Sequence, residues 1–206
     1  MKHVAVYLVV AASLCSVVNA QQAAARGTAE GTVGGKRVTV DYGRAELKGR
    51  TIDSLIAKLP ADHVWRTGAN ELTTLTTAGP LFVGGKDVPA GTYSVYVYAP
   101  ATGDWSLILN SDLGIELGAL GKFLGVSFSE ADSKRLWPHN EGYAADPAKK
   151  IPGIADKEVA RESMKAGTAS PAVDSFTIGL KPSGNGAILT FAWGEKTWSA
   201  DLKPGK

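Results

Sequence analysis

Glycine-containing turns divide this chain into short segments in which apolar and polar residues alternate. The glycine pair at residues 34–35 separates two such segments, residues 28–33 and 36–42, and similar turns fall at residues 84–85 and 183–186. Glycine takes the positive φ that a tight turn between antiparallel strands needs. Alternation with a period of two is typical of strands that bury one face. We therefore predict an all-β fold, mainly antiparallel, with the form of a β-sandwich or jelly roll.

Further strands are predicted wherever the alternation recurs. In residues 92–99 the two faces are the clearest in the chain, and the residue pair Gly194-Glu195 is expected to turn the chain between the last two strands. These further strands are predicted at residues 72–77, 81–83, 92–99, 105–109, 176–180, 189–193 and 198–202.

One short helix is predicted among the strands. Apolar residues at positions 52, 55, 56 and 59 follow helical spacing, with Thr51 as a candidate cap and Pro60 as the end. Residues 111–170 are predicted to be irregular, because glycine and proline interrupt them. Residues 113–124 fit a helix or a loop, and residues 156–165 fit a helix or a strand.

The N-terminus has the composition of a secretory signal peptide. An apolar run at residues 4–18 follows a short polar start, and Ala20 provides a small residue for cleavage. The run is short for a membrane span, although a retained anchor is the alternative, and no later segment approaches that length. We expect an exported protein, periplasmic or secreted, cut after Ala20. A flexible tail at residues 21–27 and a single domain at residues 28–202 would follow.

Charge and cysteine content exclude several classes of function. The chain has 22 basic and 20 acidic residues, and loss of Lys2 with the signal peptide lowers the formal net charge from +2 to +1. A near-neutral protein has no electrostatic basis for a nucleic-acid partner, so none is predicted. The single cysteine, Cys15, is lost with the same segment. The mature chain then has no disulfide, thiolate nucleophile or cysteine-ligated metal.

Polar chemistry is concentrated in residues 65–71, with the sequence Trp-Arg-Thr-Gly-Ala-Asn-Glu. Two interpretations stay open. In the first, Arg50, Trp65, Arg66, Asn70 and Glu71 surround a ligand site, where guanidinium groups bind a carboxylate or phosphate through two oxygens. In the second, Arg66 forms a structural ion pair with Glu71 or with Asp62 and holds a bend under Trp65.

Catalytic candidates are few. His63 and Glu71 form the best general acid and base pair, although a solvated loop histidine is the alternative. A triad of Ser94, His63 and Asp87 has no nucleophile elbow to support it. For a metal, His139-Asn140-Glu141 lacks the spacing of zinc motifs. We therefore predict no metal site and no cofactor, and non-catalytic binding as the main hypothesis.

Aromatic side chains offer a second mode of recognition. Tyr96 and Tyr98 lie on the strand face opposite to the apolar one, where exposed rings stack on sugars. Core packing is the alternative for these two residues. For the four tryptophans Trp65, Trp105, Trp193 and Trp198, core packing between two sheets is the prediction.

The motifs of this chain resemble a known bacterial family. Gly49-Arg50, the motif at residues 65–71, the glycine turn with its following strand at residues 84–94, and Trp105 with Leu109-Asn110 occur in the order seen in the family catalogued as domain of unknown function 2911. The resemblance covers residues 28–202, and its specific part is the seven-residue motif. It implies an exported β-rich domain and implies no reaction.

The sequence thus favours an exported binding module. Its ligand is expected to be small and polar, either anionic or a carbohydrate, and to bind near residues 65–71. A hydrolase-like enzyme using Glu71 and His63 is the first alternative, and an envelope structural protein is the second. The sequence leaves the oligomeric state open.

Overall fold

The computed structural model describes residues 25–138, 143–144 and 153–206. The predicted signal peptide at residues 1–20 lies outside this described part. β1 begins at Arg26, two residues before the predicted start of the domain. Within the described residues, no helix has the length and the apolar character needed to cross a membrane.

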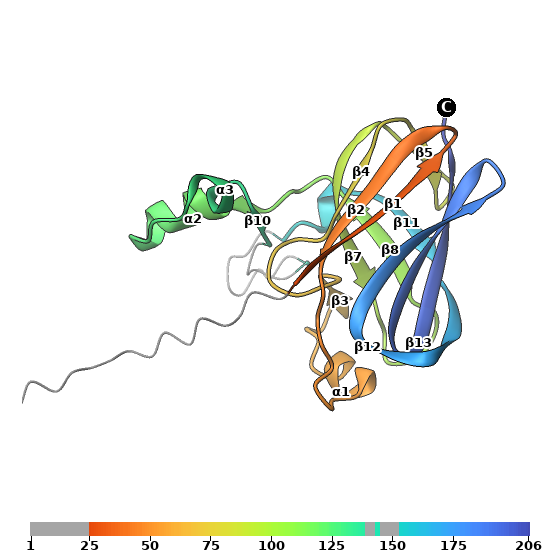
Figure 1. Ribbon diagram of the computed structural model, residues 1–206, viewed down its shortest axis with the longest axis horizontal. Coiled ribbons are helices and arrows are strands. Elements are labelled where there is room, and N and C mark those ends of the chain that lie inside the picture. Colours follow the sequence, from red (N-terminus) through yellow and green to blue (C-terminus); the bar gives the residue numbers. More distant parts are fainter. Residues whose placement is uncertain (1–24, 139–142, 145–152) are drawn as a thin grey trace, which may run out of the picture.

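Two antiparallel sheets form the body of the protein (Figure 1). The seven-stranded sheet has the order β1-β2-β4-β7-β8-β11, with β3 paired to β7, and the four-stranded sheet has the order β12-β13-β5-β6. This arrangement confirms the prediction of a mainly antiparallel, sandwich-like fold. The strands of the two sheets are β1 (Arg26–Val33), β2 (Lys36–Gly43), β3 (Val64–Trp65), β4 (Thr74–Thr77), β5 (Leu81–Val83), β6 (Lys86–Val88), β7 (Gly91–Tyr98), β8 (Ser106–Asn110), β11 (Glu158–Ser163), β12 (Lys165–Ser183) and β13 (Gly186–Pro204).

The glycine pairs form the hairpin turns that the sequence predicts. Gly34 and Gly35 join β1 to β2 with φ angles of 57° and 71°, and Gly84 and Gly85 join β5 to β6 with 57° and 80°. Positive φ at both central residues gives a turn whose twist matches that of the flanking strands. The two hairpins therefore follow directly from local sequence.

The expected turn at Gly194 is absent, and this prediction was wrong. β13 runs through the position without a break, and Gly194 lies opposite Val173 where the β12–β13 register shifts. Its φ of 58° therefore accommodates a bulge in a long strand rather than a chain reversal. A single glycine does not distinguish these two outcomes.

Large apolar side chains from both sheets fill the space between them. The four predicted core tryptophans all pack here, with Trp193 and Trp198 buried and Trp65 and Trp105 partly buried against the cluster. Trp65 stacks on Trp193 with ring centroids 5.3 Å apart and planes within 8°. Burial of each large apolar side chain stabilises the fold by roughly 1.5–3 kcal/mol. The fully buried members include Leu75, Val95, Leu107, Phe176, Leu189 and Phe191.

The outer face of the large sheet is also covered. Tyr96 of β7 and Ile108 of β8 point away from the main core and join a second cluster with Leu72, Tyr143 and Ile154. Tyr96 packs against Tyr143 with ring centroids 5.2 Å apart. The hypothesis that Tyr96 is exposed for sugar stacking is therefore wrong, because residues from the 111–160 segment bury it.

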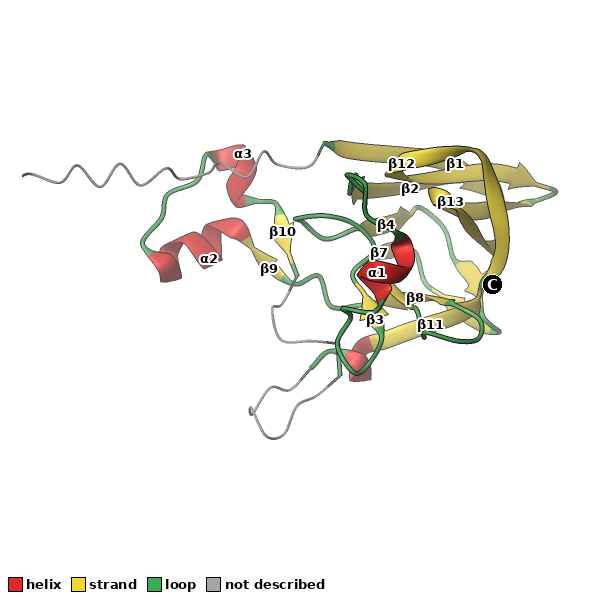
Figure 2. Cartoon of the chain, turned by 90° about the horizontal axis from the view of Figure 1, so that it is seen from below, coloured by secondary structure: helices red, strands yellow, loops and turns green. Residues whose placement is uncertain are grey.

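An arm projects from the sandwich (Figures 1 and 2). It consists of β9 (Ile115–Glu116), α2 (Leu117–Leu124), α3 (Glu130–Ser133) and β10 (Leu136–Trp137), and β10 pairs with β9 at its base. The apolar side chains of Phe123 and Leu124 are exposed on it, Phe123 by 86%. α2 lies in the stretch 113–124 that the sequence left open between helix and loop, because Gly118 and Gly121 weaken its helical signal, whereas α3 was not predicted.

The predicted short helix is present as α1 (Ile52–Ile56). The side chain of Thr51 accepts a hydrogen bond of 3.2 Å from the Ser54 amide and so caps the helix as expected. The helix ends before Pro60. A three-residue 3-10 turn, η1 (Ala155–Lys157), leads into β11.

Gly43 lies where the polar motif at residues 65–71 packs closely on β2. Its carbonyl accepts a hydrogen bond of 3.3 Å from the Ala69 amide, and a Cβ at this position would overlap the Ala69 carbonyl oxygen. We expect Gly43→Ala to cost about 2 kcal/mol or more, which lowers the melting temperature by roughly 4–8 °C.

The matched control is Gly179→Ala in β12, where an added Cβ meets no atom within 4 Å. This variant should melt at the wild-type temperature or slightly above, because alanine orders a strand better than glycine. Equal melting temperatures for the two variants would show that the close approach of Ala69 to β2 does not constrain the fold.

Candidate functional site

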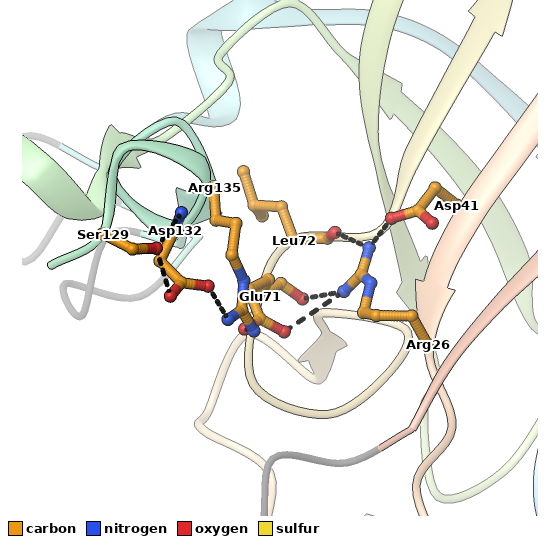
Figure 3. A network of polar contacts seen from close by, with 7 residues as sticks. All are labelled: Arg26, Asp41, Glu71, Leu72, Ser129, Asp132 and Arg135. Carbon is orange, nitrogen blue, oxygen red and sulfur yellow. Dashed lines mark hydrogen bonds and ion pairs between the residues drawn. The ribbon is translucent and has the colours of Figure 1, made fainter.

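Glu71 is a buried carboxylate held between two arginines (Figure 3). It follows a loop in which Thr67 and Asn70 both have positive φ, and only 6% of its side chain is exposed. One carboxylate oxygen lies 3.4 Å from Nη1 of Arg26, and the other forms an ion pair with Arg135. A carboxylate removed from water requires such compensation.

Arg26 enters the site from the first strand. Its guanidinium donates to the Leu72 carbonyl at 3.1 Å and forms an ion pair with Asp41 on the neighbouring strand β2. Burial and, to a smaller extent, the positive charge of Arg135 together lower the pKa of Arg26 to about 10. Two guanidinium groups are thus held close together by the carboxylate between them.

Arg135 enters the site from the arm. Its Nη1 lies 2.8 Å from Asp132, and the hydroxyl of Ser129 both accepts from the Asp132 amide and donates to its carboxylate. The cap of α3 therefore orients Asp132, and Asp132 orients Arg135. Because Arg135 also pairs with Glu71, this chain of contacts fixes the arm to the sandwich.

A pocket of about 360 Å³ opens beside these groups. Its lining combines three cationic side chains with two carboxylates, so it carries an excess of one positive charge. Lys134 is the least constrained of the cations, since 73% of its side chain is exposed and its contact to Glu130 is 3.5 Å. The charged residues of the lining are Arg26, Asp41, Glu71, Lys134 and Arg135.

Arg66 does not line the charged pocket. Its guanidinium is 5.9 Å from the ring centroid of Trp137, and burial lowers its pKa. Among the described residues Arg66 forms no ion pair, so neither expected structural pair is present: Glu71 binds Arg26 and Arg135, and Asp62 accepts hydrogen bonds from backbone amides. The structural role expected of the motif is thus carried by Glu71, with partners that the sequence did not indicate.

The predicted ligand residues Arg50, Trp65 and Asn70 also do not line the charged pocket. Trp65 packs in the core, with its ring centroid 4.9 Å from that of Phe176. Arg50 donates to the carbonyls of Leu47 and Glu46 at 2.8 and 2.7 Å in an exposed loop. Asn70 shapes the backbone through its φ of 63°. Of the five predicted residues, only Glu71 lines the charged pocket.

The predicted acid and base pair is not assembled. The ring of His63 packs edge-on against Tyr98 with centroids 6.4 Å apart, while Glu71 is occupied by guanidinium groups. Ser94 donates to the carbonyls of Asn110 and Asp112, so the triad on Ser94 has no geometric support either.

Metal binding has no assembled ligand set in the described part of the chain. No group of three or more histidine, cysteine, aspartate or glutamate side chains is placed there to hold an ion. The candidates His139 and Glu141 lie outside the described residues.

Little in the sequence indicated that Arg26 and Arg135 contact Glu71. Arg26 falls in the expected tail, and Arg135 falls in the segment expected to be irregular. They reach Glu71 across 45 and 64 positions of sequence. Only the concentration of polar residues at positions 65–71, which includes Glu71, pointed to the site.

The fold and this site define an antiparallel β-sandwich with an added arm. The buried carboxylate of Glu71 links this arm to the sandwich. Residues 24–120 match the model of a family described as protein of unknown function (DUF2911), which confirms the family resemblance over this part of the chain. The matched region contains Arg26, Asp41 and Glu71, whereas Lys134 and Arg135 follow it. No curated protein and no solved structure gives a significant match to the chain.

Removal of the charge of Glu71 tests the role of the buried carboxylate. Glu71→Gln keeps the shape of the side chain but leaves Arg26 and Arg135 facing each other without an anion between them. We expect a loss of about 3 kcal/mol, which is a fall of roughly 6–12 °C in the melting temperature.

Glu30→Gln is the matched control, because Glu30 pairs with Arg37 at 2.7 Å on the exposed surface. Such pairs contribute about 1 kcal/mol or less, so this variant should melt within roughly 4 °C of wild type. A Glu71→Gln melting temperature as high as that of the control would contradict a structural role for Glu71.

Proposed function

We propose that this protein is a non-catalytic binding module for a small anionic ligand, and that the charged pocket is its site. The observation that carries the proposal is the composition of the pocket, where Arg26, Lys134 and Arg135 face only two carboxylates in a space of about 360 Å³. The volume lies in the range of small-molecule sites. The pocket lies between the sandwich and the arm, so both parts of the chain contribute to it.

The geometry favours an anion over a neutral ligand. Asp41 and Glu71 hold Arg26 in place, and Asp132 and Glu71 hold Arg135, so the two guanidinium groups are oriented before any ligand arrives. Guanidinium groups bind two oxygens of a carboxylate or phosphate at once, and Lys134 adds a mobile charge at the mouth. A bound anion would also relieve the repulsion that lowers the pKa of Arg26.

The same contacts argue against the enzyme alternative. A carboxylate paired with two guanidinium groups is a poor proton acceptor, and no described contact joins Glu71 to His63. We therefore assign Glu71 the role of organising the cationic groups.

We further infer that binding takes place outside the cytoplasm, in the periplasm or after secretion. The inference rests on the apolar run at residues 4–18 and the small residue Ala20 after it. N-terminal sequencing of the protein recovered from the producing cell tests it, with residue 21 as the expected first residue.

Calorimetric titration with inorganic phosphate, succinate and citrate tests the binding proposal. We expect at least one of these anions to bind wild type, and Lys134→Ala to weaken that binding by about tenfold, since a hydrogen bond to a charged group contributes ~1.5 kcal/mol. The exposure of Lys134 means that this variant should melt like wild type.

Lys165→Ala is the control, because the Lys165 side chain is 80% exposed, is not part of the pocket lining, and contacts Asp201 at 3.4 Å. It should bind the anion with wild-type affinity. If no anion of the panel binds wild type, or if both lysine variants bind equally well, the proposed function is wrong.

A further inference from the structure

A second pocket, of about 400 Å³, shares no lining residue with the charged pocket. It lies where α1, the loop between β7 and β8, and the strands β12 and β13 meet. Its buried residues, Met164 and Trp198, form the floor together with the partly buried Trp105. The charged residues Asp53, Asp104 and Lys196 are exposed and therefore form the rim.

Trp105 is held as a flat platform in this pocket. Its ring is parallel to that of Trp198 within 4°, with the ring centroids 4.0 Å apart. Trp198 is buried in the core and covers one face of Trp105, while Trp105 itself stays partly accessible. The stack fixes the orientation of the accessible indole, so a ligand that lies on it does not have to order the ring.

The rim places hydrogen-bonding groups around this platform. Nζ of Lys196 lies 2.6 Å from Asp53 and bridges the pocket edge from β13 to α1. Asp104 directly precedes the platform residue, and among the described residues it makes no ion pair or side-chain hydrogen bond. The rim thus offers two carboxylates as acceptors and one ammonium group as a donor, with a net charge of −1.

The indole platform and the charged rim together favour one class of ligand over others. An anion would face two carboxylates, and a flat apolar molecule would leave the charged rim without partners. A neutral sugar ring has an apolar C–H face that fits an indole and hydroxyl groups at its edge that donate to carboxylates and accept from lysine. We propose that the pocket around Trp105 binds a neutral saccharide and is independent of the anion site.

Calorimetric titration of the protein with cellohexaose, xylohexaose, mannohexaose and chitohexaose tests the proposal. We expect wild type to bind at least one of them. Trp105→Ala should weaken that binding by about tenfold or more, the loss typical of a central aromatic contact. Because this change also removes the partner of Trp198, its thermal melt must be recorded in parallel.

A second variant keeps the stack intact. Ala101 is exposed on the pocket wall, so Ala101→Arg should fill the space without disturbing the core and should weaken binding by about tenfold as well. Phe82→Ala removes an exposed aromatic ring outside the pocket. The affinity of this variant for the saccharide should stay within about twofold of wild type.

Two results would overturn the proposal: wild type binds none of the four saccharides, or Trp105→Ala and Ala101→Arg both bind like wild type. Lys134→Ala separates this site from the anion site, because it should leave saccharide binding unchanged. A protein that binds a saccharide but no anion would support this inference and refute the proposed function alone.

Discussion

The ion-pair network around Glu71 is the interaction on which the arrangement of this protein depends. A carboxylate with 6% of its side chain exposed is stable only where cations replace its water, and the chain supplies these from its first strand and from its arm. Arg26 connects the network to Asp41 on β2, and Arg135 connects it to the cap of α3. One buried charge thus fixes the start of β1, the position of the arm and the shape of the charged pocket.

The arm and the segment after it also change the environment of the large sheet. Leu136 of the arm, with Tyr143 and Ile154 further along the chain, packs on the outer faces of β7 and β8, so that Tyr96 and Ile108 are buried on the side away from the main core. Burial, with a smaller contribution from Asp112, raises the pKa of Tyr96 to about 12, which keeps its hydroxyl neutral below strongly alkaline pH. The central strands are therefore covered by an apolar layer on each face, and the two pockets lie at the margins of the sandwich.

Local signals in the sequence predicted most of the fold and little of the site. The turn at Gly34 and Gly35 and the cap at Thr51 each depend on a few neighbouring residues, and both are present. One interpretation of the sequence paired Glu71 with the nearby Arg66, whereas its partners lie 45 and 64 positions away. Alternation along β7 gave the two faces correctly, but nothing local indicated that a later segment would bury Tyr96. Contacts between distant segments carry no periodicity, which is why these assignments needed the structure.

The most direct test of the central role of Glu71 is amide hydrogen exchange at Leu72, whose N–H donates to the Leu136 carbonyl of the arm at 2.9 Å. In Arg135→Gln the arm loses its ion pair to the sandwich, so the Leu72 amide should exchange about tenfold faster or more, while the Leu189 amide of β13 keeps its wild-type rate. An unchanged rate at Leu72 in this variant would contradict the account, because the arm would then be held without the Glu71 network.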